Sequence, residues 1–561
     1  MPVMRNQFLK FSVAFLFITI LILIKSGGFA QTSPTCYFVE FTDKKISPFS
    51  VNDPLKYLSQ KALNRRAKHH ISVTPQDFPV NPWYLDSLKA TGAKVLFSSR
   101  WFNAATVSID TSIILTKISN LSFIKNYSKV YKKIGVNTQV YQTKAQSAVF
   151  DENEYGESYP QIAMLNGQFL HQNDFKGNGV LMAVIDAGFF RVDSLDAFSY
   201  LFQNHRILAT HDFVVGDDSV YEDATHGMLV LSAIAGRLPG KLLGTAPEAS
   251  FILLRSENAG SEYLIEEDAW TVASEYADSA GVDLISSSLG YTTYDDPAMS
   301  HEYLQIDGKT TRVTKAANIA FSKGILVITS AGNEGNKSWK HISAPADGDS
   351  VLAIGAVDVN RKRARFSSLG PTFDGDIKPN VAAMGDNTIC ASTSNGETTT
   401  ASGTSLSAPV LAGMAACLIG AFPDRTNREI KKAIEMSGSQ YTNPDDSLGY
   451  GIPDFKVAYE ILKLTVKETP KEDFKILEFY PNPFVSDITI TYYSKDKLSM
   501  KIQVSDNMGR IVLDSNIITK ENKVDKINLG MKNINGTGLF ILTIDTGKQK
   551  ITQKLIKLTA K

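Results

Sequence analysis

Apolar and polar positions alternate with two different periods along the chain, and changes of period divide it into regions. Between residues 160 and 463, short apolar runs alternate with stretches of helical period. The apolar runs cover residues 180–185, 250–254, 282–286, 325–329 and 351–354, and the helical stretches cover 227–235, 266–280 and 313–323. Strands that are apolar on both faces and alternate with helices predict an α/β region, a parallel sheet with helices on both faces.

The region before it, residues 31–150, mixes the two periods over shorter segments. Strands are expected at 37–41, 94–97 and 105–109, and helices at 55–68 and 113–118. These elements predict a small α+β domain. The region ends in the polar stretch 140–159, which predicts an exposed linker open to proteolysis. The α/β domain is therefore expected to span 155–463.

The last region, residues 474–561, has strand-like segments about ten residues apart with Gly-containing turns between some of them. This spacing predicts a small β-sandwich. The charged segment 464–473, which contains Pro470, is expected to be the linker before it.

The first 30 residues read as a secretory signal peptide. Arg5 and Lys10 precede the apolar run 11–24, and small residues lead to a cleavage site after Ala30. An uncleaved membrane anchor is the alternative, but the run is shorter than the roughly 20 residues that span a bilayer. The protein is therefore expected to be exported.

Composition changes this picture little. The 561 residues carry no net formal charge, which gives no reason to expect nucleic acid as a partner. Three cysteines allow one disulfide at most, and whether Cys390 and Cys417 pair stays open. No Cys and His spacing resembles a zinc site, so no metal ligands are predicted.

Candidate chemistry gathers around Ser405. It lies in the small-residue turn Gly403-Thr-Ser-Leu-Ser-Ala-Pro409, which runs into an apolar helix. Backbone N–H groups and the positive end of the helix dipole lie at such a position and suit a nucleophile. The alternative is that Ser405 only caps the helix.

Three further polar residues occupy similar places. Asp186 follows an expected strand, His226 precedes an expected helix, and Asn333 follows the strand at 325–329. Asp186 would orient the imidazole, His226 would take the Ser405 proton, and the Asn333 amide would donate to an oxyanion. Each alone has an ordinary alternative as a capping or turn residue. Their occurrence together, in this order and at these places, favours catalysis.

These motifs make the chain resemble the subtilisin-like serine proteases, or subtilases, and the triad order is the one known for subtilisin. The resemblance covers residues 160–463 and implies that Ser405 is the nucleophile, His226 the general base, Asp186 its partner and Asn333 the oxyanion donor. Its motifs are Val184-Ile-Asp-Ala-Gly188, Thr225-His-Gly227, Ser288-Leu-Gly290, Ser330-Ala-Gly-Asn333 and Gly403-Thr-Ser-Leu-Ser-Ala-Pro409.

The same resemblance implies where a peptide would bind. Ser288, Leu289 and Gly290 would pair with the substrate backbone, and Ala331 and Gly332 would form the floor of the primary specificity pocket. The chain departs from the family where Ala187, Met228 and Leu406-Ser407 replace its usual residues, and none of these removes a triad group. No cofactor is expected to be required. Structural calcium is common in the family, but no ligand loop can be matched here.

The regions on either side of the α/β domain can now be interpreted as well. The 31–150 region resembles a subtilase propeptide, an intramolecular inhibitor, with a retained accessory domain as the alternative. The last region resembles the sorting domains of type IX secretion substrates through Phe479-Tyr-Pro-Asn-Pro-Phe484 and Asp506-Asn-Met-Gly-Arg510, with a carbohydrate-binding sandwich as the alternative. Such a domain implies contact with secretion machinery and passage across the outer membrane.

The resulting prediction is a secreted or cell-surface serine endopeptidase that acts on proteins or peptides through an acyl-enzyme. The alternative from another class is an inactive surface protein of the same fold that binds or adheres. A peptide ligase on this fold is a third, minor alternative. All four polar residues are present, which argues against an inactive copy.

Overall fold

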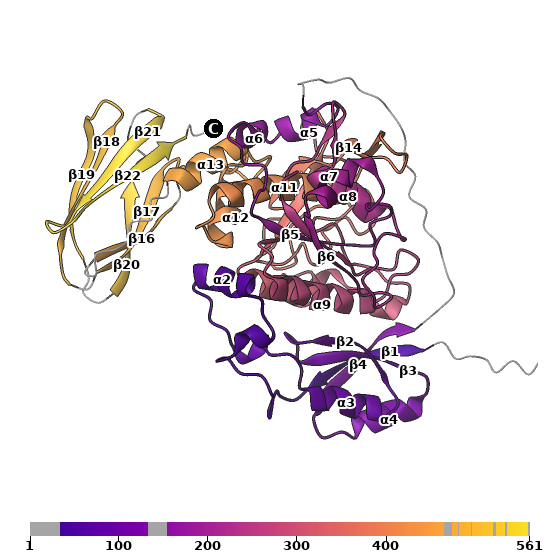
Figure 1. Ribbon diagram of the computed structural model, residues 1–561. Helices are drawn as coiled ribbons and strands as arrows, with labels where there is room; N and C mark the ends of the chain where they lie inside the picture. Colours follow the sequence, from indigo (N-terminus) through magenta and orange to yellow (C-terminus); the bar gives the residue numbers. More distant parts are fainter. Residues whose placement is uncertain are drawn as a thin grey trace, which may run out of the picture.

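The computed structural model describes residues 34–132, 154–464 and 474–558, apart from residues 481, 495, 520–522, 533 and 535. The predicted signal peptide and most of the two predicted linkers lie outside the described residues. The described chain forms three regions, with the large α/β region in the middle (Figure 1).

The α/β region is built on a seven-stranded sheet in the order β13-β12-β11-β10-β5-β9-β6, in which every recorded pairing is parallel. The predicted strands are confirmed, and the sequence prediction missed the two edge strands, β6 and β13. The strands are β5 (Leu181–Asp186), β6 (Ile207–Asp212), β9 (Ser250–Arg255), β10 (Leu284–Ser287), β11 (Leu326–Ser330), β12 (Leu352–Val357) and β13 (Val381–Met384).

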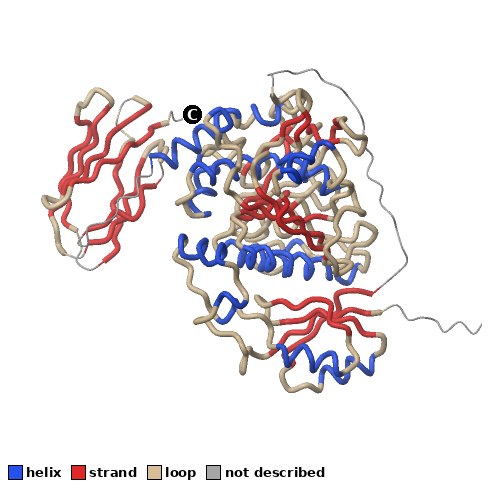
Figure 2. Tube along the Cα trace, viewed as in Figure 1, coloured by secondary structure: helices blue, strands red, loops and turns tan. Residues whose placement is uncertain are grey.

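Helices cover both faces of this sheet (Figure 2). The helices α8 (His226–Ala235) and α11 (Thr404–Ala421) lie on one face, and α9 (Ile265–Ala280) and α10 (Arg312–Ser322) lie on the other. Around them lie α5 (Tyr159–Ala163), α6 (Gln168–Gln172), α7 (Asp196–Gln203), α12 (Asn427–Met436) and α13 (Phe455–Leu464), with the short strand pairs β7 (Arg237–Leu238) with β8 (Leu242–Leu243) and β14 (Thr388–Ala391) with β15 (Thr398–Ala401).

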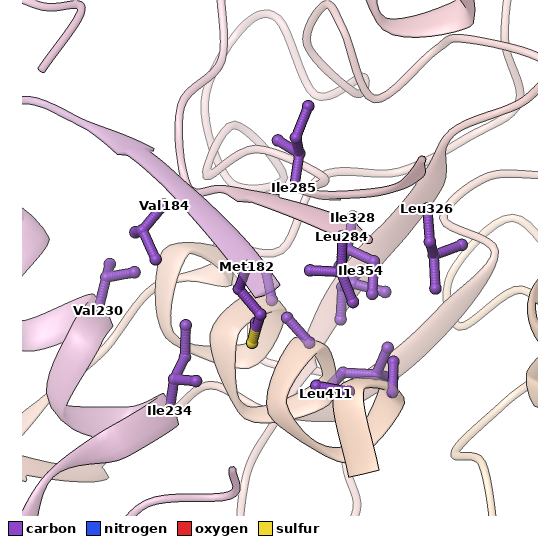
Figure 3. Packing of buried hydrophobic residues seen from close by; sticks show 14 of the residues in the cluster. Met182, Val184, Val230, Ile234, Leu284, Ile285, Leu326, Ile328, Ile354 and Leu411 are labelled. Carbon is purple, nitrogen blue, oxygen red and sulfur yellow. The ribbon is translucent and has the colours of Figure 1, made fainter. Parts of the chain in front are cut away.

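The core between the sheet and α8 and α11 is aliphatic. Met182 and Leu284 point from neighbouring strands toward Leu411 of α11, and Val230 and Ile234 of α8 lie beside them (Figure 3). Helix α11 is long and apolar enough to cross a membrane, but 89% of it is buried, so it serves as the central core helix. Cys417 lies on this helix, and all three cysteines are buried and unpaired.

The N-terminal region is the predicted α+β domain. Its antiparallel sheet has the order β2-β3-β1-β4 and lies under α9 (Figure 1). The expected helix at 55–68 is instead a 3-10 turn followed by α2, because Ser59 caps a new helix by accepting the Ala62 N–H. Its elements are β1 (Thr35–Phe41), α2 (Gln60–Lys68), α3 (Pro82–Ala90), β2 (Lys94–Ser99), β3 (Ala104–Ile109), α4 (Ser112–Ser119) and β4 (Ile124–Lys132).

The C-terminal region is the predicted β-sandwich. One sheet has the order β16-β17-β20, the other β19-β18-β21-β22, and residues such as Ile490 and Leu542 fill the space between them. The sequence prediction missed β16 and β20. The strands are β16 (Phe474–Tyr480), β17 (Asp487–Ser494), β18 (Ser499–Asp506), β19 (Ile511–Ile518), β20 (Lys523–Gly530), β21 (Gly538–Asp545) and β22 (Lys550–Lys557).

Candidate active site

Asp186 and His226 form a close pair at the carboxyl-end edge of the large sheet. Asp186 is the last residue of β5 and is fully buried, while His226 is the first residue of α8. The Asp186 Oδ1 lies 2.7 Å from His226 Nδ1 and also accepts the Ala187 N–H at 2.8 Å. This pairing places the proton of the neutral ring on Nδ1 and leaves the basic lone pair on Nε2.

The surroundings of His226 tune its basicity. Burial alone would lower the pKa of His226, but the charge of Asp186 and its hydrogen bond outweigh burial and raise it. The raised pKa strengthens the imidazole as a proton acceptor. At the same time, it limits the neutral, acceptor form to higher pH.

Close packing of two backbone turns fixes this pair. A Cβ atom on Gly227 would lie 2.3 Å from the Gly188 carbonyl oxygen and 3.0 Å from the Asp186 Cβ. Only a glycine after His226 therefore lets α8 begin against the turn after β5. Arg255, the last residue of β9, also holds that turn, because its Nε donates to the Ala187 carbonyl at 3.1 Å.

Ser405 and Asn333 come together at the start of α11. Ser405 is the second residue of that helix. The Asn333 Oδ1 accepts from the Thr404 N–H at 2.9 Å and the Thr404 hydroxyl at 3.0 Å, so its amide nitrogen points the other way. A Cβ built on Gly403 would lie 2.7 Å from the Ser405 Oγ and 3.5 Å from the Asn333 Nδ2, which places both groups around the same point.

A hydrogen bond from Ser288 completes the backbone at Ser405. Pro409 follows Ser405 by four residues and has no N–H, so the Ser405 carbonyl lacks its usual helical partner. The Ser288 hydroxyl donates to that carbonyl at 2.8 Å instead. Since Ser288 follows β10, this bond ties the segment 288–290 to the start of α11.

Gly290 and Gly332 both lie against the Ser343 side chain. A Cβ on Gly290 would lie 2.2 Å from the Ser343 Oγ, and one on Gly332 would lie 3.0 Å from it. The Ser343 hydroxyl is buried and has no hydrogen-bond partner among the described residues. Leu289 and Ala331 are buried beside these glycines.

The structure thus pairs Asp186 with His226 and places Asn333 beside Ser405. His226 and Ser405 each lie in the first turn of a neighbouring helix that begins at the edge where β5 ends. Sequence reasoning gave no role to Thr404, although it lies within the serine motif. It also missed Ser343 and Glu257, a loop residue after β9 whose carboxylate lies near Asp186 and His226. The only signal for Thr404 was its motif, and no signal in the sequence separated the other two from ordinary loop residues.

A buried carboxylate, an imidazole, a serine at a helix start and an amide donor define a serine hydrolase site on an α/β sheet. A model of the subtilase family matches residues 177–451. A model of the peptidase S8 propeptide domain of Bacteroidota matches residues 36–147, and one of the secretion system C-terminal sorting domain matches residues 478–558.

Individual relatives agree with the family models. The chain is 30% identical over 303 residues to subtilisin of Bacillus pumilus, which covers 53% of this chain and 97% of the relative. Identity to serine protease AprX of Bacillus subtilis (strain 168) is 29% over 322 residues, 52% of this chain and 67% of that protein. Identity to subtilisin NAT of Bacillus subtilis subsp. natto is 28% over 367 residues, which are 64% of this chain and 81% of that protein.

The chain belongs to the subtilase family. It is a serine endopeptidase with an N-terminal propeptide domain, and its sorting domain directs it to the cell surface or the medium. Nothing in the matches favours the inactive binding protein that the sequence left as an alternative. The propeptide and sorting readings of the flanking regions are likewise confirmed.

Proposed function

We propose that Ser405 attacks the scissile carbonyl while His226 takes its proton, and that Asp186 holds the ring and stabilises the imidazolium. The imidazolium then gives its proton to the leaving amine, and water activated by the same ring hydrolyses the acyl-enzyme. The observation that carries this assignment is the 2.7 Å contact between Asp186 and His226 at the edge where α11 presents Ser405.

Asn333 has the role of the oxyanion donor in this proposal. Its oxygen is occupied by Thr404, so its nitrogen faces the space beside Ser405 without having to reorient during the reaction. Donors fixed in advance stabilise developing charge most effectively. A backbone N–H at the start of α11 supplies the second donor.

The segment of Ser288, Leu289 and Gly290 would bind the substrate backbone as an added strand. Ala331 and Gly332 would line the primary specificity pocket, and Ser343 would close its inner end. The support is that Gly290 and Gly332 both lie against the Ser343 hydroxyl, which is buried and has no hydrogen-bond partner among the described residues. The reaction uses only groups of this chain, so we propose that the chemistry itself requires no cofactor.

A fluorophosphonate probe tests the assignment. Exported protein is incubated with the probe, and labelled peptides are identified by mass spectrometry. Label on Ser405 is expected, with the rate unchanged just after a chelator is added. Ser402→Ala is the matched control, because Ser402 lies in the same turn but is exposed and bonds Asp386. Cleavage of protein by Ser405→Ala would contradict the proposal.

We further infer that the propeptide domain inhibits the enzyme within the same chain. The propeptide domain binds α9 through a cluster of buried charges. The fully buried Asp278 carboxylate of α9 accepts hydrogen bonds from Arg65 at 2.5 Å, Arg66 at 2.8 Å and Arg100 at 2.6 Å. All three arginines belong to the propeptide domain. A carboxylate surrounded in this way is costly to separate from its partners.

A second carboxylate on α9 recognises the propeptide backbone. The Glu275 side chain accepts from the Ser99 hydroxyl at 2.6 Å and from the N–H groups of Arg100 at 2.9 Å and Trp101 at 3.1 Å. These contacts fix the end of β2 on α9. The fixed sheet delivers the end of β4 to the loop before α9, where Tyr131 packs edge-on against Tyr263 with ring centroids 4.7 Å apart.

A further inference from the structure

The loop between β9 and α9, residues 256–264, lies beside the triad. Its first N–H, from Ser256, donates to the Asp186 carbonyl at 3.1 Å. The next residue is Glu257, and Glu262 lies near the other end of the loop. The loop therefore carries two carboxylates past the residue that orients the imidazole.

The order of the sheet makes this loop one wall of the substrate groove. Strand β5, which ends at Asp186, lies between β10 and β9. The segment after β10 is the proposed substrate strand that begins at Ser288, and the loop after β9 stands opposite it. Two hydrogen bonds join the two walls: the Asp295 N–H donates to the Glu262 carbonyl at 2.9 Å, and the Glu262 N–H donates to the Asp295 carboxylate at 3.3 Å.

A third glutamate, Glu266, explains how the loop keeps its shape. This buried carboxylate accepts the Asn258 N–H and the Tyr263 N–H, each at 3.1 Å. Glu266 is therefore satisfied by the backbone. By contrast, no Lys or Arg in the described part of the chain forms an ion pair with Glu257 or Glu262.

Tyr291 supplies an independent sign that a ligand belongs here. It directly follows Gly290 and is fully buried, and its hydroxyl faces Glu257 but makes no well-formed hydrogen bond with any described residue. Neither carboxylate has a Lys or Arg partner among the described residues, and the only cationic neighbour of Glu257 is the His226 ring. These carboxylates and a buried phenol without a well-formed bond are expensive to leave in this state. A cationic group with several N–H donors would satisfy them together.

The raised pKa values of Glu257 and Glu262 agree with a site that a cation would complete. Burial and the nearby charge of Asp186 raise the pKa of Glu257 to about 7. Burial and the charge of Glu257 raise the pKa of Glu262 well above its usual range. A bound cation would stabilise both charged forms.

Strand β4 of the propeptide domain ends beside the same loop. Strand β4 ends in Lys129-Val-Tyr-Lys132, its Tyr131 contacts Tyr263 of the acidic loop, and Lys129 pairs with Asp296 at 3.0 Å. The propeptide domain thus contacts the acidic loop through Tyr131 and carries lysines in the same strand end.

We propose that Glu257 and Glu262 form a subsite for a Lys or Arg side chain on the acyl side of the scissile bond. The inference rests on the proposed function, because the loop borders a substrate groove only if Ser405 is the nucleophile. The substrate class is therefore proteins that carry a basic residue shortly before the cleaved bond.

The test compares fluorogenic peptides that differ at one position. Lysine is exchanged for uncharged norleucine or for glutamate at the second, third and fourth residue before the cleaved bond. At one position lysine should raise kcat/KM about tenfold or more over norleucine, since hydrogen bonds to a charged group are worth about 1.5–3 kcal/mol. Glutamate should be the poorest.

Variants assign the preference to the loop. In Glu257→Gln and Glu262→Gln the lysine preference should shrink, and in the double variant it should fall to within about twofold of norleucine. Glu397→Gln is the matched control, because Glu397 is an exposed glutamate that pairs only with Lys241 among the described residues. The control should keep the preference.

The outcomes separate the two proposals. Labelled Ser405 with no lysine preference in the wild-type protein would overturn the basic subsite and leave the nucleophile assignment intact. A preference that survives in the double variant would also overturn it. No label on Ser405 would instead refute the proposed function. The wild-type peptide series decides the matter even where a variant does not fold.

Discussion

The sheet edge that carries Ser405 and the face of α9 that carries Asp278 differ in how far their polar groups are satisfied by the protein itself. At the edge, polar groups are held by few hydrogen bonds and by glycines that allow close backbone approach. On α9, buried carboxylates are surrounded by arginines and N–H groups of the propeptide. The first arrangement leaves polar groups available for a substrate. In the second, all of the charged groups are used to bind the propeptide domain.

This difference is what the proposed inhibition requires of a chain that holds an enzyme and its propeptide domain together. Reactive groups must stay accessible, so they cannot be satisfied by the protein itself. Charges that bind the propeptide can be fully matched, because their task ends when the propeptide leaves. Substitutions at the two places should therefore have distinct effects, on turnover at the edge and on inhibition at α9.

The largest effect is expected for Ser405→Ala. Loss of the nucleophile should lower kcat by about a millionfold, because the remaining groups act only as a unit with it. Peptide hydrolysis measured over long incubations checks this. The propeptide should remain joined to the chain, and a variant that processes itself would contradict the prediction.

Asp186→Asn should lower kcat by about 10⁴-fold, because the ring loses its orientation and its counter-charge. The pKa of His226 is raised by Asp186, so removing the carboxylate should lower it. Activity of the wild-type protein falls when His226 becomes protonated as pH decreases, so the acid limb of the variant should move to lower pH. A pH–kcat/KM profile measures the shift, and an unmoved limb would count against the pairing.

Asp278→Asn tests the α9 face. Three arginines would lose their shared carboxylate, and breaking a buried pair costs about 3–5 kcal/mol, so binding of the cleaved propeptide should weaken by several hundredfold. Gel filtration of self-processed protein, with inhibition assays, measures retention. Asp218→Asn, on an 83% exposed side chain, is the control. Equal retention in both would refute the role of the cluster.

Ser288→Ala should have a smaller effect on turnover. It leaves the Ser405 carbonyl without a partner, which costs about 1–3 kcal/mol and loosens the first turn of α11. We expect a reduction of kcat/KM of about tenfold, with a parallel loss of thermal stability. Ser288→Thr keeps the hydroxyl and should retain more activity. Similar losses in both variants would show that the hydroxyl is not what matters.

Ala187→Ser should have the smallest effect. The Asp186 Oδ2 is buried and has no hydrogen-bond partner among the described residues, and Ala187 offers no hydroxyl where the family usually has one. A serine there should stabilise the carboxylate and change kcat/KM by no more than about threefold. Steady-state kinetics measure the change, and a loss beyond about tenfold would mean that the site has no room for a hydroxyl.

Much of the catalytic edge could be predicted from sequence because its constraints are local. Asp186 and His226 stand in short motifs, since a strand end or a helix start beside a glycine is encoded by neighbouring residues. Strand β6 was missed because it is only partly buried and lacks a continuous apolar run. The helix expected at 55–68 was too long because Ser59 begins a new helix by capping it.

By itself the sequence determined the order of the three regions, the parallel sheet and the catalytic motifs, because periodicity and turn chemistry act over a few residues. Only the tertiary structure decided that Asp278 meets Arg65, Arg66 and Arg100, and that Glu257 faces Tyr291 across the end of β5. These contacts join residues far apart in the chain. Burial and the distances between charges, which fix their energies, exist only after folding.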